Sequence, residues 1–196
     1  TRGPRQCFCW FNTSALRTAD RSRTRPGGSY TPLMTTAPTT ELNRAELARQ
    51  IASACVLRGN FTLRSGRTST YYIDKYLFST RPEILRGLGL LFAQRIRAIG
   101  AAAGLPVHRL AGAELGGIPL VTTACMATGI PCIFVRNAKK DYGTAKQMEG
   151  QLVPGEHVIF VEDVATTGGQ ALEGVKILTD AGAKVLGVIA VIDRQE

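Results

Sequence analysis

Two spacings of apolar residues alternate along residues 43–196, one typical of helices and the other of buried strands. Helical spacing occurs in four stretches: residues 43–57, 82–100, 116–127 and 170–181. Short apolar runs typical of strands lie between and after them: residues 108–113, 132–136, 157–162 and 184–193. Strands that alternate with helices predict an α/β fold, with a mostly parallel central sheet flanked by helices on both faces.

The first two helices carry start and stop signals. One is expected to begin at Asn43, with Glu46 three residues on as in a capping box, and to end at Gly59. The other is expected to begin at Pro82 and to stop at Gly100.

The stretch FTLRSGRTSTYYID, residues 61–74, lies between these helices and predicts a hairpin. Ser65 and Gly66 are its turn residues, and aromatic and β-branched residues follow them. Together with the helix before it, the hairpin is expected to form a small N-terminal hood beside the main sheet.

Residues 1–33 differ from the rest of the chain, because Arg, Ser, Thr, Gly and Pro dominate them without periodicity. An Arg-rich start that is poor in acids could be a transit-like peptide. The composition favours a disordered or non-native extension instead, with Met34 as the natural start and residues 34–196 as the folded domain.

Composition narrows the class of protein. Hydrophobic residues make up 44% and charged residues 20%, as in ordinary globular proteins, and no apolar run approaches the length that spans a membrane. The five cysteines form no CxxC pair and their odd number argues against a disulfide framework, so a reducing cytosol is the simplest location. His108 and His157 each come at the start of a predicted strand and are expected to be structural.

The net charge of +9 is unevenly distributed. Residues 1–33 contain six arginines against Asp20 alone, which leaves a net charge of +4 on the remaining chain. A polyanionic small-molecule substrate would account for that excess, so no nucleic-acid partner is expected.

Residues 158–169, VIFVEDVATTGG, carry the clearest chemical signal. Pairs of threonines and glycines open the helical pattern that follows, where backbone N–H groups and the positive end of the helix dipole suit a phosphate. Glu162 and Asp163 come one step earlier, where carboxylates can accept hydrogen bonds from sugar hydroxyls. Neither GxxxxGK[ST] nor GxGxxG occurs. The run predicts a site for a phosphorylated sugar; the alternative is an ordinary βα turn.

Charged residues follow several predicted strands. Glu114, Arg136, Glu162 and Arg194 all fall at or just past a strand end, where ligands bind in parallel sheets. Residues 136–150 are polar and contain three lysines, which fits either a solvated surface loop or a mobile lid that brings cations onto a leaving diphosphate. The position directly after a strand favours the lid.

The acidic pair and the Thr/Gly turn resemble the phosphoribosyl pyrophosphate (PRPP) motif of type I phosphoribosyltransferases. Residues 43–196 as a whole resemble the orotate phosphoribosyltransferases. Four segments carry this narrower likeness: FTLRSGRTSTYYID, GAELGGIP, VRNAKKDYG with its trailing EG, and VEDVATTGG followed by DRQE. The resemblance implies the type I phosphoribosyltransferase fold and transfer of the phosphoribosyl group from PRPP to orotate, which gives orotidine 5′-phosphate and pyrophosphate in pyrimidine biosynthesis.

The resemblance also implies a role for each matching residue. The implied PRPP-binding residues are Arg64, Leu115, Gly116, Arg136, Asn137, Lys139, Lys140, Tyr142, Glu162, Asp163, Val164, Ala165, Thr166, Thr167, Gly168, Gly169 and Gln170. The implied orotate-binding residues are Tyr72, Ile73, Thr166 and Arg194. The implied catalytic residues are Lys140, Glu162 and Asp163. Arg194 would pair with the orotate carboxylate, a contact that suits a bidentate guanidinium.

The implied catalysis is mainly electrostatic. Loss of pyrophosphate builds positive charge on the ribose and negative charge on the leaving group, so Mg²⁺, lid lysines and carboxylates suffice without a protein nucleophile. Magnesium would be held mainly through PRPP and water, so no protein metal ligand is expected. The resemblance further implies a homodimer in which the lid of one subunit reaches the neighbouring site.

The chain departs from the family at three places. Asn137 stands where many members have Lys, and Tyr142 where many have His. The sequence also stops two residues after Arg194, which suggests truncation at the C-terminus.

Two other functions stay open at this point. One is phosphoribosyl transfer to another base such as hypoxanthine, xanthine or uracil, which would leave Arg194 without a carboxylate partner. The other is a regulatory protein of the same fold that binds PRPP without turning it over.

Overall fold

A computed structural model describes residues 7–12, 43–62, 66, 68–137 and 147–194 of the chain. Its strands are β1 (Cys7–Asn12), β2 (Val56–Thr62), β3 (Thr68–Ile73), β4 (Arg109–Ala113), β5 (Cys132–Val135), β6 (Met148–Glu149), β7 (His157–Ala165) and β8 (Lys184–Asp193). Its helices are α2 (Arg44–Cys55), α3 (Tyr76–Ser79), α4 (Pro82–Ala103), α5 (Gly117–Thr128) and α6 (Gly169–Asp180).

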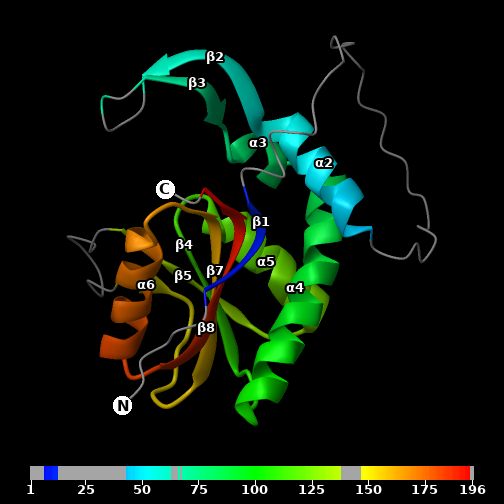
Figure 1. Cartoon of the computed structure of the whole chain (residues 1–196). Coiled ribbons are helices and arrows are strands. Elements are labelled where there is room, and N and C mark those ends of the chain that lie inside the picture. Colours follow the sequence, from blue (N-terminus) through cyan, green and yellow to red (C-terminus); the bar gives the residue numbers. More distant parts are fainter. Residues whose placement is uncertain (1–6, 13–42, 63–65, 67, 138–146, 195–196) are drawn as a thin grey trace.

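The main sheet has the strand order β1-β8-β7-β4-β5-β6. The first five of these strands run parallel, and β6 is an antiparallel edge strand that pairs with β5. The predicted α/β class with a mostly parallel sheet is therefore confirmed. In Figure 1, α6 covers one face of this sheet, while α4 and α5 cover the other.

Side chains that alternate along β7 divide the core between these two faces. Ile159 and Val161 belong to the larger core cluster, which α2, α4 and α5 share. Val158 and Phe160 belong to a second cluster on the α6 face. A Cβ atom on Gly174 of α6 would lie 2.6 Å from the Phe160 ring, so the glycine lets the helix pack closely against the sheet.

The predicted helix starts are confirmed, but two predicted ends are wrong. Asn43 caps α2, where its Oδ1 atom accepts a hydrogen bond of 3.1 Å from the Glu46 N–H. Helix α2 ends at Cys55 rather than near Gly59, because the chain pairs at once with β3 as strand β2. Pro82 begins α4 as expected, yet the helix passes Gly100 and ends at Ala103, where Gly104 adopts the left-handed conformation.

The N-terminal region contains a strand that the composition did not predict. Residues 7–12, CFCWFN, form β1 and pair in parallel with β8, from Cys7 opposite Val188 to Asn12 opposite Asp193. The expectation of a disordered or non-native extension over residues 1–33 did not include this strand. Aromatic and apolar residues favour strands, and a run this short is hidden by the Arg- and Ser-rich sequence around it. The domain boundary after residue 33 stays a prediction.

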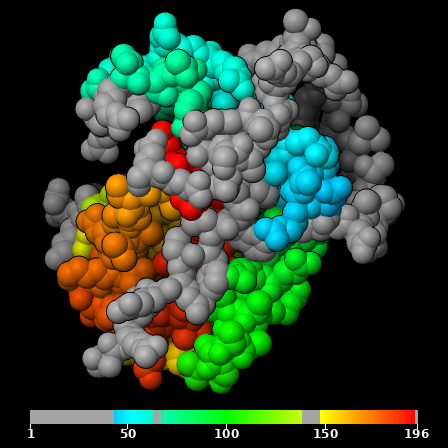
Figure 2. Space-filling view, in the orientation of Figure 1, coloured from blue at the N-terminus to red at the C-terminus, as the bar shows by residue number. Residues whose placement is uncertain are grey.

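The hood stands above the sheet edge at which β7 and β8 end (Figure 1). Strands β2 and β3 pair as the predicted antiparallel hairpin, and the Asp74 N–H donates to the Cys55 carbonyl where the hairpin returns to α2. In the space-filling view of Figure 2, the end of β8 is visible between the hairpin above and α6 below. The hairpin therefore faces the edge where the sequence predicts the ligand.

A structural polar cluster lies at the opposite end of the strands, where β4 and β7 begin. Arg109 donates two hydrogen bonds of 2.6 Å to the Glu156 carboxylate. The His157 N–H donates to His108 Nδ1 at 2.9 Å, and the two imidazole rings lie 4.9 Å apart. Both histidines thus hold the starts of β4 and β7 together, as expected for a structural role. Among the described residues, none of the helices has the length and apolarity that a membrane span needs.

Candidate functional site

Strand β7 reaches further than the sequence predicts. The expected strand ends at Glu162, but pairing with β8 continues through Val164 and Ala165, opposite Ile192 and Asp193. The acidic pair therefore lies within the strand and is buried, with Glu162 5% and Asp163 2% exposed. Continued backbone pairing outweighs the low strand propensity of the two acids.

A hollow of about 340 Å³ lies between the end of β7 and the start of α6. The residues that line it are Glu162, Val164, Ala165, Thr166, Thr167, Gly168, Gly169, Gln170 and Ala171. All of these except Ala171 are residues that the sequence predicts to bind PRPP. The volume falls within the range of small-molecule sites.

The helix end of this hollow suits an anion. Gly168 caps α6 in the left-handed conformation, with φ of 78°, and the helix begins at Gly169. The first turn contains no acidic residue, so its unpaired N–H groups and the positive end of the dipole are open to a negative ligand. A sugar phosphate is the kind of group that such a helix start binds.

The strand end of the hollow is acidic. The Asp163 N–H donates to Glu162 Oε1 at 2.9 Å, and the Val164 N–H donates to Asp163 Oδ1 at 2.6 Å. Burial, and then repulsion from Asp163, raises the pKa of Glu162 to about 8. No described residue hydrogen-bonds to Glu162 Oε2. The free protein therefore holds a buried carboxyl that has a raised pKa and unmet hydrogen-bonding capacity at this end of the hollow.

The loop between β4 and α5 packs directly against the acidic pair. A Cβ atom on Gly116 would lie 1.6 Å from Asp163 Oδ2, so only glycine fits there. Leu115 is 64% exposed beside it. This loop, where the resemblance implies backbone contact with pyrophosphate, thus borders the carboxylates.

Asn137 joins the ends of β4 and β5. Its backbone N–H donates to Glu114 Oε1 at 2.9 Å, and its side-chain Nδ2 donates to the Glu114 carbonyl at 3.3 Å. Arg136 next to it lies with its Nη1 atom 3.6 Å from Glu149 Oε1 of β6. Asn137 therefore has a structural partner of its own in Glu114.

The residues predicted to bind orotate come from the hood and from the end of β8. Tyr72 is 45% exposed on the hairpin, and its ring lies 5.7 Å from that of Phe61. Ile73 is half-buried in the next position. The Arg194 N–H donates to the Ala165 carbonyl at 2.9 Å. This contact brings the end of β8 beside the phosphate corner, the turn of residues 166–169 between β7 and α6.

Four predicted site residues lie outside the described residues: Arg64, Lys139, Lys140 and Tyr142. Their roles, and the function of the segment that contains the three lid residues, stay predictions.

Comparison with known proteins gives the same family as the residues. No protein-family model matches the chain. The orotate phosphoribosyltransferase of Pyrococcus furiosus is 41% identical over 154 residues, which span 78% of this chain and 82% of that protein. The orotate phosphoribosyltransferase of Natronomonas pharaonis is 46% identical over 138 residues, or 70% of this chain and 75% of that protein. The chain belongs to the orotate phosphoribosyltransferase family.

Solved structures of the family share the fold. The orotate phosphoribosyltransferase of Mycobacterium tuberculosis H37Rv in complex with PRPP matches with a TM-score of 0.61 and 32% identity, over 76% of this chain and 82% of that one. The enzyme of Aeropyrum pernix matches with a TM-score of 0.64 and 30% identity, over 76% and 82%. An adenine phosphoribosyltransferase matches with a TM-score of 0.59 at 19% identity, over 76% and 90%, so the fold extends to enzymes for other bases.

Lys75 contacts the acidic pair but is not among the site residues that the sequence predicts. Its Nζ atom lies 2.7 Å from Asp163 Oδ2. The sequence gives little warning of this contact, because 88 positions separate the two residues and Lys75 sits between the hairpin and α3, outside every recognised motif. Only the placement of the hood over the sheet edge brings them together.

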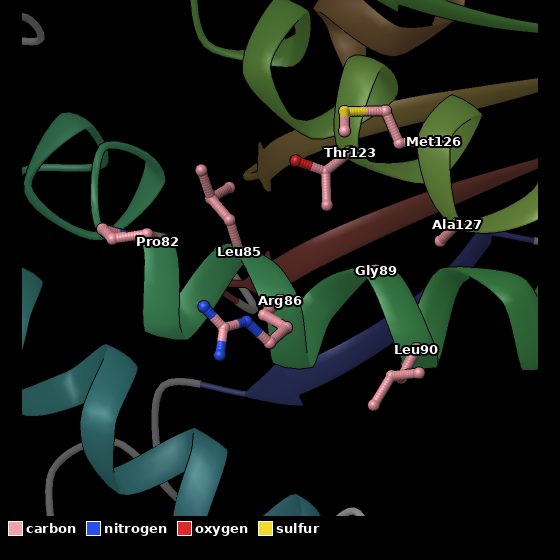
Figure 3. Close-up of a pocket in the computed structure, with 8 residues that line it drawn as sticks. All are labelled: Pro82, Leu85, Arg86, Gly89, Leu90, Thr123, Met126 and Ala127. Carbon is pink, nitrogen blue, oxygen red and sulfur yellow. The ribbon is translucent and has the colours of Figure 1, made fainter. Parts of the chain in front are cut away.

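A second hollow, of about 450 Å³, lies between α4 and α5. Figure 3 shows its lining, which is mostly apolar and includes Leu85, Leu90 and Met126. Arg86 is the one charged residue among the lining side chains that the structure describes. This surface is poorly suited to a polyanionic substrate of the family, unlike the hollow beside β7.

Proposed function

We propose that this chain transfers the 5-phosphoribosyl group of PRPP to orotate, which yields orotidine 5′-phosphate and pyrophosphate, a step in pyrimidine nucleotide synthesis. The observation that supports this most strongly is the hollow in which Glu162 of the buried acidic pair of β7 meets an acid-free helix start at α6. It offers hydrogen-bond acceptors for ribose hydroxyls at one end and N–H donors for a phosphate at the other.

The chemistry that these residues supply is binding and electrostatic stabilisation. Gly168 and the first turn of α6 would hold the 5-phosphate, which fixes the sugar relative to the carboxylates. Glu162 and Asp163 would hydrogen-bond to the ribose hydroxyls and place their oxygen atoms near the positive charge that develops at C1. The Leu115–Gly116 backbone would face the departing pyrophosphate.

Magnesium fits this site as an ion that arrives with the substrate. Hard oxygen ligands suit Mg²⁺, which retains several waters and commonly binds through substrate phosphates. The acidic end of the hollow gives such a hydrated ion a negative surface to face, and no side chain is assigned as its ligand. When bound, the ion would neutralise charge on the diphosphate as it leaves.

The lid and the diphosphate contacts form the remaining part of the proposal. Arg64 of the hairpin turn, and Arg136, Lys139, Lys140 and Tyr142 around the lid, would place cations and a hydrogen-bond donor on the leaving group. Loss of Lys140 should then lower kcat more than it weakens PRPP binding, because the contact strengthens as charge develops.

The base pocket would be formed by Tyr72, Ile73, Thr166 and Arg194. The shared fold does not choose the base, because an adenine enzyme has it too. Arg194 would determine which base is bound, because a guanidinium near the reacting centre favours a base that bears a carboxylate.

A turnover assay tests this assignment. Orotate absorbance and pyrophosphate release are measured with PRPP and Mg²⁺, and uracil, hypoxanthine and xanthine serve as competing bases. Arg194→Ala should raise the KM for orotate at least tenfold, whereas Arg97→Ala on the exposed side of α4 should leave it unchanged. Turnover of another base but not of orotate would contradict the assignment. PRPP binding without turnover of any base would favour a regulatory protein.

We further infer a homodimer. The groove between α4 and α5 leaves Leu90 51% and Met126 83% exposed, an apolar surface that a second copy could cover. Leu90→Glu combined with Met126→Glu should shift the mass measured by light scattering from dimer to monomer. Leu172→Glu on α6, where the leucine is 63% exposed, is the matched control. An unchanged dimer would contradict this interface. A cytosolic location stays a prediction from the cysteine pattern.

A further inference from the structure

Lys75 is the link between the hood and the acidic pair. It lies between β3 and α3, and its ammonium group pairs with Asp163 Oδ2 at 2.7 Å. The Asp163 side chain is 3% exposed and the lysine side chain 31% exposed. The aspartate side of the ion pair is thus covered by protein, whereas the lysine side is partly exposed to solvent.

Three separate segments meet at this ion pair. Gly116 of the β4–α5 loop packs against the same Asp163 oxygen, and a Cβ at Gly116 would also lie 3.3 Å from Lys75 Cε. The hood, the loop next to the leaving pyrophosphate and the acidic strand therefore converge within contact distance. An ion pair that only stabilised the fold could join the hood to any part of the sheet. This ion pair instead involves a carboxylate of the proposed site.

The charges at this point compensate one another. Glu162 and Asp163 are adjacent buried acids, and Lys75 is the cation paired with them among the described residues. Burial is the largest single effect and lowers the pKa of Lys75, but hydrogen bonding and charge attraction to Asp163, added to smaller effects of its neighbours, leave the pKa above its usual value. Tyr76 and Glu162 also face the ammonium and act in the same direction. The lysine therefore stays charged beside the acidic pair.

We propose that Lys75 is a positioning residue of the PRPP site, where its ion pair holds the Asp163 carboxylate in the orientation that binds the ribose. This inference rests on the proposed function. It assigns to the hood a part in binding the donor sugar, in addition to its proposed contacts with the base and with the diphosphate. Without Lys75, the Asp163 carboxylate would lose its ion-pair partner and the contact that fixes its orientation next to Glu162.

Three variants test the proposal on the full chain. Lys75→Met removes the charge and keeps most of the volume, Lys75→Arg retains the charge, and Lys176→Met is a matched control on the exposed side of α6, where Lys176 pairs with Asp180. KM for PRPP, KM for orotate and kcat are measured for each. The affinity for PRPP with Mg²⁺ is measured separately by titration calorimetry, without any base.

The expected result is a selective loss of donor binding. Lys75→Met should raise the KM and the calorimetric Kd for PRPP at least tenfold, with KM for orotate changed less than threefold and kcat less than fivefold. Lys75→Arg should restore PRPP binding to within threefold of the wild type, and Lys176→Met should match the wild type throughout.

Other results would overturn the proposal. Unchanged PRPP affinity in Lys75→Met, even with a lowered melting temperature, would assign Lys75 to folding alone. Equal losses in the Met and Arg variants would show that charge is not what matters. A wild type that binds PRPP but does not convert orotate would instead refute the proposed function, and the calorimetric comparison would still decide the role of Lys75.

Discussion

The substitution Glu162→Gln should remove a pH dependence of stability that the buried acidic pair imposes on the ligand-free protein. Burial and then repulsion from Asp163 raise the pKa of Glu162 from 4.5 to about 8. Because the folded state holds this proton more tightly than the unfolded state, the stabilisation is complete below the unfolded value. It is lost as the pH rises through the folded value.

The two pKa values set the size of the effect. Between about pH 5.5 and about pH 8.5, a single group with these values removes about 3 kcal/mol from the free energy of unfolding. A glutamine has nearly the same shape and cannot ionise, so the variant should lack this part of the pH dependence. It should also be more stable than the wild type at the alkaline end.

Urea unfolding without PRPP at both pH values measures the difference. Glu173→Gln, at an exposed position on α6, is the control and should follow the wild type. If the wild type and Glu162→Gln lost the same free energy between the two pH values, within about 0.5 kcal/mol, the raised pKa and the burial argument would both be wrong.

Three further predictions concern other parts of the molecule. Gly116→Ala places a Cβ where the Asp163 carboxylate lies, so PRPP affinity measured by calorimetry should fall at least tenfold; parental affinity would contradict the packing of that loop. Arg109→Leu leaves Glu156 without its partner, so the free energy of unfolding measured in urea should fall by about 2–3 kcal/mol with the KM values unchanged. Adding Glu156→Leu should recover most of this loss. Asn43→Ala removes the cap of α2 and should cost about 1 kcal/mol; an unchanged unfolding curve would exclude that cap.

The order and type of most elements could be predicted from the sequence because their apolar spacing is regular. Helix α6 and strand β8 follow the predicted stretches closely, and the β2–β3 hairpin is confirmed. Boundaries were predicted less well where pairing partners decide them. The chain leaves α2 at Cys55 because β3 is there to pair with, and β7 passes through Glu162 and Asp163 because β8 continues alongside.

The phosphate corner could be predicted because all its residues are consecutive in sequence. The environment of this corner could not be predicted from the sequence. Burial of the acidic pair depends on how far β7 extends, and the contact with Lys75 depends on where the hood sits. The strand β1 was missed because its five apolar and aromatic residues are outweighed by the composition of their surroundings.

The central claim is that the hollow between β7 and α6 grips the donor sugar while orotate takes the phosphoribosyl group. The most direct measurement follows orotate absorbance and released pyrophosphate together, in the presence of PRPP and Mg²⁺. We expect one pyrophosphate for each orotate consumed, and none when uracil or hypoxanthine replaces orotate. Pyrophosphate release with those bases but not with orotate, or with no base at all, would contradict the account.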